Sequence, residues 1–171
     1  MTSIVIVDCD GVLLNWRDSF NRWAYRHQFV AEIDQWPRKD YSPPQMLGGA
    51  ENTLMKVFNQ THFVGKLPPI EGAIQAIQAI HRAGYALRVV TAFSDEYESM
   101  VLRQQNFTNV FGNVFEEIVC LPIGSSKADY LRRQPKDSYF IEDSAHHLEE
   151  ALEVGFEPGR LGLITQDYNA H

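Results

Sequence analysis

Two acidic residues, Asp8 and Asp10, follow directly after a short apolar run, Ile4-Val5-Ile6-Val7. Such runs are typical of strands buried on both faces of a parallel sheet, and ligands bind beyond the carboxyl ends of those strands. Two neighbouring carboxylates disfavour joint ionisation, and a bound cation relieves their repulsion. The spacing of two residues also allows one carboxylate to act as a nucleophile while the other serves as acid and base. The pair therefore predicts covalent catalysis at a cation site.

Polar side chains also follow three later apolar runs. They are Thr91 after residues 86–90, Lys127 shortly after 118–121, and Glu142 with Asp143 after 139–141. Because the carboxyl ends of parallel strands lie at one edge of a sheet, we expect these groups beside Asp8 and Asp10. Phosphoryl transfer requires such a set: a nucleophile, a magnesium ion and donors to the transferred oxygens. The order and strand context of the groups therefore predict a phosphoryl-transfer site.

The elements that must position these residues alternate along the chain. Five short apolar runs are expected to form strands: residues 4–7, 86–90, 118–121, 139–141 and 161–164. Residues 71–82, about 127–133 and about 145–154 show helical spacing. Strands of the buried type joined by helices indicate a parallel sheet covered on both sides. We therefore predict an α/β core built from residues 1–14 and 70–171.

Residues 15–69 break this alternation, because they contain no strand-like run. Aromatic residues recur there at helical spacing, with Trp16, Phe20, Trp23 and His27 on one face of a predicted helix. The segment carries a formal charge of +2, whereas the rest of the chain carries −9. We therefore predict a small helical cap inserted after the first strand.

The composition limits the possible functions. At 171 residues, with 44% hydrophobic and 22% charged residues, the chain is expected to fold around one buried core. Lys and Arg number 15 against 22 Asp and Glu, so the basic surface of a nucleic-acid-binding protein is lacking. The first residues do not resemble a signal peptide, and no apolar run approaches the roughly 18 residues of a membrane span. We expect a cytoplasmic protein without nucleic-acid or membrane partners.

Together the polar residues resemble the motifs of the haloacid dehalogenase (HAD) superfamily. Asp8-x-Asp10-Gly11-Val12-Leu13 resembles motif I, Val90-Thr91-Ala92 motif II, Lys127 motif III and Ile141-Glu142-Asp143-Ser144 motif IV. The match spans the chain apart from residues 15–69, which lie where the C1 caps of that superfamily lie. The resemblance implies a HAD-like Rossmannoid core with a parallel sheet and a small helical cap.

The resemblance also implies a role for each residue. Asp8 would be the nucleophile that becomes an aspartyl-phosphate. Asp10 would protonate the leaving group and then activate water. Thr91, Ala92 and Lys127 would bind the phosphoryl group.

Magnesium is the cofactor that the resemblance implies. Its expected ligands are Asp8, the backbone carbonyl of Asp10, and Asp143, with Glu142 in the outer shell. An Asp at position 10 is typical of the phosphatases and phosphomutases of the superfamily, whereas its dehalogenases lack an acid there. The resemblance therefore implies a magnesium-dependent phosphomonoester hydrolase.

The expected substrate is a small phosphorylated metabolite, with a nucleoside 5′-monophosphate as the first choice. The aromatic insert, which closes at residues 63–70, is similar to that of the 5′(3′)-deoxyribonucleotidases. Those enzymes usually carry Asp-Asp at motif IV, whereas Glu142-Asp143 is more typical of relatives that act on sugar phosphates or phosphoglycolate. A sugar-phosphate or phosphoglycolate phosphatase is therefore the alternative.

Five aromatic residues of the insert have two possible roles: Trp16, Trp23, Trp36, Phe20 and Phe63, of which Trp16 and Trp23 are the candidates for a substrate wall. Their flat rings could stack a nucleobase, or they could supply the core of a unit of about 55 residues. Packing is the favoured interpretation, with one or two of the rings also forming a substrate wall. His146 and His147, which follow motif IV, are expected to be solvated at a helix start, because no further ligand at metal spacing is evident.

Two alternatives without catalysis remain open from the residues alone. Receiver domains of two-component signalling also combine a phosphorylatable Asp with an acid pair, Thr and Lys, but their phosphoacceptor lies on a middle strand. Here no acid ends the strand predicted at 86–90. A catalytically silent regulator with the same fold is the second alternative, although every polar position of the set is present. Turnover of p-nitrophenyl phosphate with magnesium separates both from an enzyme.

Overall fold

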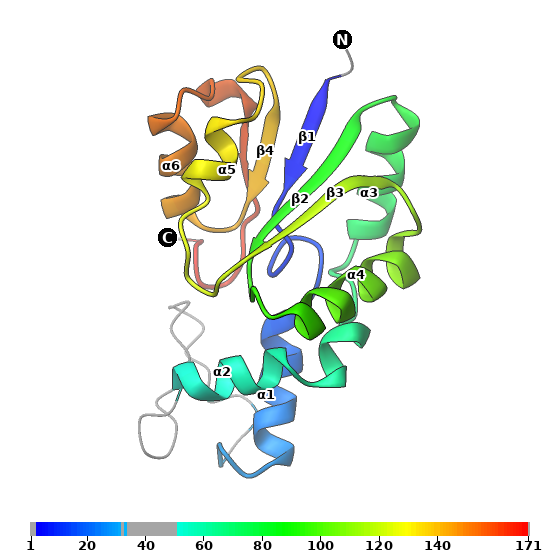
Figure 1. Cartoon of the computed structure of the whole chain (residues 1–171), viewed down its shortest axis with the longest axis vertical. Helices are drawn as coiled ribbons and strands as arrows, with labels where there is room; N and C mark the ends of the chain where they lie inside the picture. Colours follow the sequence, from blue (N-terminus) through cyan, green and yellow to red (C-terminus); the bar gives the residue numbers. More distant parts are fainter. Residues whose placement is uncertain (1–2, 32, 34–50, 171) are drawn as a thin grey trace.

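The computed structural model describes residues 3–31, 33 and 51–170, and a parallel sheet forms its centre (Figure 1). The strands are β1 (Ile4–Val7), β2 (Ala86–Ala92), β3 (Phe115–Leu121), β4 (Tyr139–Glu142) and β5 (Leu161–Leu163), in the order β3-β2-β1-β4-β5. Val7 pairs with Val89 of β2 and with Ile141 of β4, so β1 lies in the middle. The predicted parallel sheet is confirmed. Its two strands beside β1 are those that carry Thr91 and Glu142 near their carboxyl ends.

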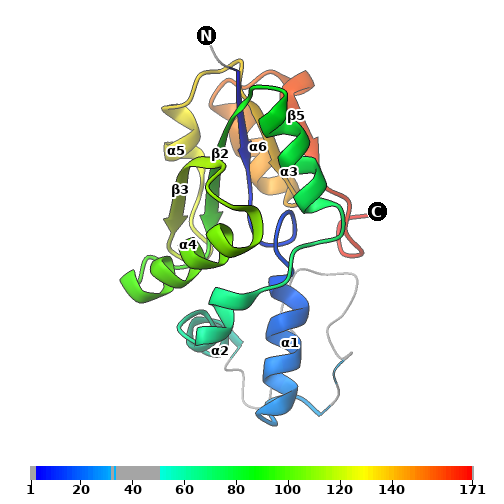
Figure 2. The same ribbon diagram turned by 90° about the vertical axis from the view of Figure 1, so that its right-hand side faces the viewer.

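Helices cover both faces of the sheet (Figure 2). One layer contains α3 (Ala73–Arg82) and α4 (Tyr97–Phe111), and the other contains α5 (Ala128–Arg132) and α6 (Ala145–Glu153). Val5 and Val7 pack in the core on the side of α3 and α4, whereas Ile6 packs on the side of α5 and α6. A short 3₁₀ helix, η2 (Pro158–Arg160), precedes β5. Burial on both faces explains why β1 is apolar throughout.

β3 and α4 differ most from the sequence prediction, and β2 also runs two residues beyond the predicted strand, so that it includes Thr91 and Ala92. β3 begins at Phe115, three residues before the predicted strand at 118–121. The prediction misses this part of the strand because exposed Glu116 and Glu117 interrupt the apolar run. β3 is an edge strand, where charged residues are tolerated. The helix α4 is absent from the prediction because polar residues, among them Arg103 and Asn106, occupy its buried face. No helix in the described part of the chain is long and apolar enough to cross a membrane.

Between β1 and α3 the described residues form α1 (Trp16–Arg26), α2 (Glu51–Asn59) and the 3₁₀ helix η1 (His62–Lys66). Both views place α1 and α2 beyond the carboxyl ends of β1 and β2 (Figures 1 and 2). Phe20 stacks on Trp16 with ring centroids 4.9 Å apart and meets Phe58 of α2 edge-on at 5.5 Å. The described residues of 15–69 contribute no strand to the five-stranded sheet. Residues 34–50 of the predicted cap lie outside the described residues.

The chain leaves the core and returns to it through two adjacent backbone segments. The N–H of Asn15 donates to the carbonyl of Pro68 at 2.9 Å, and the N–H of Ile70 donates to the carbonyl of Leu13 at 2.9 Å. The two connections of the inserted helices are therefore fixed side by side, a few residues from Asp10.

Candidate active site

Asp8 follows β1 directly, and its buried carboxylate contacts the ammonium group of Lys127. The same Lys127 Nζ donates to Glu142 Oε2 at 2.6 Å. Burial and the neighbouring carboxylate of Glu142 raise the pKa of Asp8 to about 7, although the charge of Lys127 opposes the shift. Burial favours a neutral lysine, but the two carboxylates outweigh it and raise the pKa of Lys127 above its ordinary value. A charged lysine therefore lies against Asp8 in a buried network.

Asp143 follows β4 and forms a group of three buried carboxylates with Asp8 and Glu142. One oxygen of each residue lies within 4.8 Å of the other two. Burial and the negative charge of Asp8 raise the pKa of Asp143 to about 9. A divalent cation would remove this conflict between like charges, and oxygen ligands are those that magnesium prefers. The donor set therefore fits magnesium.

Glu142 already uses both of its oxygens within the protein. Oε2 accepts from Lys127, and Oε1 accepts from the backbone N–H groups of Asp143 at 3.0 Å and Ser144 at 3.2 Å. Burial opposes ionisation, but Lys127 and these hydrogen bonds hold the pKa of Glu142 below its ordinary value. This arrangement suits a residue that holds Lys127 and the backbone of Asp143 in place.

The carboxylates open into a cavity of about 600 Å³, a size that suits a small metabolite. α2 contributes part of its wall, including Asn52, Met55, Lys56 and Asn59. The predicted site residues that line it are Asp8, Asp10, Trp16, Thr91, Ala92, Lys127, Glu142 and Asp143. The fold thus brings together the residues that the motifs identified, although they come from four separate parts of the chain.

The two tryptophans of the predicted substrate wall have different surroundings. Trp16 lines the cavity, and its indole N–H donates to Asn59 Oδ1 at 2.7 Å. The amide of Asn59 in turn donates to the carbonyl of Phe93 at 2.9 Å. Trp23 is not among the described residues that line the cavity, and its ring packs 5.5 Å from that of Phe58. Trp16 is therefore the ring of the two that lies where a substrate can reach it.

Asp10 is bound by Arg103, a residue that the sequence analysis misses. Arg103 of α4 has no exposed surface, and two of its nitrogens donate to the two carboxylate oxygens of Asp10 at 2.8 Å each. Its guanidinium also lies 4.0 Å from the ring centroid of Phe93 and 3.0 Å from Cys9 Sγ. Two-point pairing of this kind fixes orientation as well as distance. The sequence offers no signal for it, because a single arginine in a helix is normally exposed.

Gly11 and the residues after β5 surround Asp143. Gly11 has a φ of +89°, and a Cβ at this position would lie 2.0 Å from Asp143 Oδ2. The phenol of Tyr168 donates to that same oxygen, and Asn169 donates to the carbonyl of Asp143 at 2.7 Å. Gln166 donates to the carbonyl of Gly11 at 2.7 Å. Gly11 belongs to motif I and can therefore be identified from the sequence. The other three residues belong to no motif.

Curated proteins with a related sequence match part of the chain. No protein-family model matches. A curated protein of Bordetella bronchiseptica named "Putative 5'(3')-deoxyribonucleotidase" is 28% identical over 105 residues, which cover 57% of this chain and 54% of that protein. The chain therefore spans about half the length of the curated relatives it matches.

Solved structures share the fold over nearly the whole chain. CbbY from Rhodobacter sphaeroides in complex with phosphate is 18% identical with a TM-score of 0.61, covering 100% of this chain and 89% of that one. A HAD-superfamily hydrolase from Ehrlichia chaffeensis is 15% identical with a TM-score of 0.53, covering 98% and 94%. D,D-heptose 1,7-bisphosphate phosphatase from Burkholderia thailandensis is 13% identical with a TM-score of 0.52, covering 98% and 95%. The chain therefore has the fold of the HAD superfamily, which confirms the fold implied by its motifs.

Proposed function

We propose that the chain is a magnesium-dependent phosphomonoester hydrolase that acts through an aspartyl-phosphate on Asp8. The observation that carries the proposal is the buried contact between Asp8 and Lys127 at a cavity that Thr91 and Asp143 also line. An ammonium group and a hydroxyl are suitable donors to phosphoryl oxygens. The shared fold with a bisphosphate phosphatase and the name of the curated relatives support the same chemistry.

In the first step, an oxygen of Asp8 forms a bond to phosphorus while the bond between phosphorus and the leaving oxygen breaks. Asp10, as a carboxylic acid, transfers its proton to that leaving oxygen. The Lys127 ammonium, the Thr91 hydroxyl and the backbone at Ala92 bind the phosphoryl oxygens. The products are the free alcohol and a phosphorylated Asp8.

In the second step, Asp10, now a carboxylate, accepts a proton from water. The water oxygen forms a bond to phosphorus, and the bond between phosphorus and Asp8 breaks to release inorganic phosphate. Because Arg103 binds both oxygens of Asp10, at least one of these hydrogen bonds must open during the cycle. Asp8, Asp143 and the backbone carbonyl of Asp10 would hold magnesium, which would supply positive charge to the site.

The inserted helices act, in this proposal, as a cap of residues 15–69 over a core of residues 1–14 and 70–171. One wall of the cavity comes from α1 and α2, through Trp16, Asn52, Met55, Lys56 and Asn59. A wall of this kind limits the substrate to small molecules and helps to exclude water during transfer. Lys56 also adds a positive charge to this wall.

A nucleoside 5′-monophosphate is the substrate that we propose first. Trp16 lines the cavity and offers an aromatic surface to a base, and the curated relatives carry the name of deoxyribonucleotidases. A sugar phosphate or phosphoglycolate is the alternative. It is supported by the Glu142-Asp143 pair and by the heptose bisphosphate phosphatase among the structures that share the fold.

Release of inorganic phosphate from a panel of esters tests this function. We expect release that needs magnesium, is fastest with a nucleoside 5′-monophosphate, and is lost in Asp8→Asn, because an amide is not a nucleophile. If a sugar phosphate or phosphoglycolate turns over much faster than every nucleotide, the proposed substrate is wrong but the proposed reaction stands. Failure with every ester, p-nitrophenyl phosphate included, would favour a phospho-receiver or a silent regulator.

A further inference from the structure

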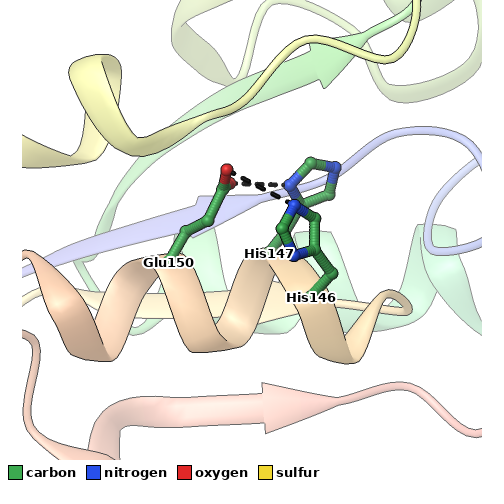
Figure 3. Close-up of side chains that lie close together, drawn as sticks. All are labelled: His146, His147 and Glu150. Atoms are coloured by element: carbon green, nitrogen blue, oxygen red, sulfur yellow. Dashed lines mark hydrogen bonds and ion pairs between the residues drawn. The ribbon is translucent and has the colours of Figure 1, made fainter.

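Two histidines and a glutamate of α6 form a second cluster of metal-ligating side chains, separate from the three buried carboxylates. His146, His147 and Glu150 project from the same side of the helix (Figure 3). Residues three and four positions apart lie one helical turn from each other on one face, which places Glu150 beside both histidines. The two imidazoles also line the 600 Å³ cavity.

The donor atoms of this cluster are close enough to share one ion. His147 Nδ1 lies 2.8 Å from Glu150 Oε2, and His146 Nε2 lies 3.6 Å from Glu150 Oε1. One donor atom of each residue lies within 4.8 Å of the other two. Ligand atoms at the bond lengths of a tetrahedral zinc site are separated by roughly 3.3 Å. Only small side-chain rotations therefore separate the observed arrangement from a three-ligand site.

Glu150 is the most firmly held member of the cluster. Its side chain is buried, and Oε2 accepts from the backbone N–H of Lys127 at 3.0 Å. Burial opposes ionisation, but hydrogen bonds from Ser126, His147 and the Lys127 backbone keep the pKa of Glu150 below its ordinary value. Ligating carboxylates in metal sites are held by hydrogen bonds in the same way. His146 is largely exposed, as predicted for the pair, whereas His147 is partly buried beside Glu150.

We propose that His146, His147 and Glu150 bind a divalent transition metal of the zinc type. Imidazole nitrogens suit zinc, cobalt and nickel, whereas the all-oxygen set of Asp8 and Asp143 suits magnesium. The cavity therefore has two cation sites that differ in chemistry. Three protein ligands leave a coordination position for water or an anion within the cavity.

Cobalt(II) is the probe for this site, because its visible absorption strengthens when nitrogen ligands bind it at low coordination number, whereas magnesium is spectroscopically silent. The full chain without a histidine tag is titrated in slightly alkaline solution with saturating magnesium. We expect one equivalent of cobalt to bind with strengthened absorption that zinc abolishes by competition. His146→Gln and His147→Gln should each weaken binding by about tenfold or more, and the double variant should abolish the spectrum.

Two further variants serve as controls. His81→Gln removes an exposed histidine of α3, and Asp8→Asn alters the oxygen cluster. Both should keep the cobalt spectrum, and circular dichroism verifies that all variants are folded. A wild-type protein without the strengthened absorption, or a double variant that keeps it, would overturn the proposal. Loss of the spectrum in Asp8→Asn would overturn it as well, by assigning the cobalt to the carboxylates.

Discussion

Arg103 binds both carboxylate oxygens of Asp10, and this pair joins α4 to the loop that follows β1. Three residues further along the same helix, Asn106 accepts from the N–H of Leu67 at 2.9 Å and donates to its carbonyl at 3.1 Å. One buried face of α4 therefore contacts both Asp10 and the segment through which the chain returns from the inserted helices. The position of Asp10 relative to those helices depends on α4.

Substitution of Arg103 tests whether it orients Asp10 for proton transfer. Arg103→Lys keeps the charge but not the two-point geometry. It should slow the first step, formation of phosphorylated Asp8, strongly for alkyl phosphates and little for p-nitrophenyl phosphate, because a nitrophenolate departs without a proton. Release of the alcohol or nitrophenol within a single turnover measures this step apart from the hydrolysis of phosphorylated Asp8, which both esters share. An equal loss for both would argue against an effect through Asp10.

The same pair is expected to contribute to stability. Arg103→Met leaves the carboxylate of Asp10 without its partner in a largely buried position, so the free energy of unfolding should fall by about 3–5 kcal/mol. Denaturant unfolding measures this quantity. A change below about 1 kcal/mol would mean that water replaces the guanidinium at little cost.

Two glycines with positive φ offer a matched test of the site beside Asp143. Gly11 and Gly72 have φ values of +89° and +83°, but a Cβ meets Asp143 only at Gly11, and nothing lies within 4 Å at Gly72. Each substitution by alanine should cost roughly 1–2 kcal/mol of stability through backbone strain. Gly11→Ala should also displace Asp143 and abolish magnesium-dependent phosphate release, whereas Gly72→Ala should retain it. Full activity in Gly11→Ala would refute the importance of this close approach.

The raised pKa values predict how magnesium and pH act together. In the metal-free protein the pKa of Asp8 is about 7 and that of Asp143 about 9, against an ordinary 3.8 for both. For both residues the pKa in the folded state exceeds the pKa in the unfolded state, so protonation of the carboxyl groups stabilises the fold at low pH. This stabilisation is lost as the pH rises through about 7 for Asp8 and about 9 for Asp143. Chelator-treated protein should therefore lose stability towards alkaline pH, and magnesium should restore more of it as the pH rises.

Thermal unfolding with and without magnesium at a series of pH values measures this dependence. A control in Asp143→Asn, which cannot ionise, should show a weaker response to both magnesium and pH. Stabilisation by magnesium that is the same at acid and alkaline pH would contradict the assignment of the ion to these carboxylates.

The two tryptophans should separate substrate contact from packing. Trp16→Ala is expected to raise KM for a nucleoside 5′-monophosphate more than KM for p-nitrophenyl phosphate, because only the nucleotide has a base to place against the ring. Trp23→Ala should lower stability by about 3–5 kcal/mol and leave the ratio of the two KM values unchanged. If Trp16→Ala also leaves that ratio unchanged, its ring has a packing role and the nucleotide assignment loses its support.

The sheet and the motif residues could be predicted because their signals are local. The apolar run at Ile4–Val7 and the acids that follow it stand next to each other in the sequence, and parallel topology alone brings the other strand ends to the same edge. Arg103 and Tyr168 could not be found in this way. They contact residues 93 and 25 positions away, respectively, and neither belongs to an apolar pattern or a motif. Their roles come from tertiary packing, which a single sequence does not encode in local patterns.

Direct detection of the phosphorylated enzyme tests the central claim, that Asp8 is the nucleophile. The Asp10→Asn variant is mixed with p-nitrophenyl phosphate, quenched in acid within one turnover, and digested for peptide mass spectrometry. Because a nitrophenolate departs without acid help while water lacks its base, the intermediate should accumulate in this variant. One phosphoryl group is expected on the peptide that contains Asp8, and none when Asp8→Asn is added. Release of nitrophenol with no phosphoryl group on that peptide, or with the group on another residue, would contradict the claim.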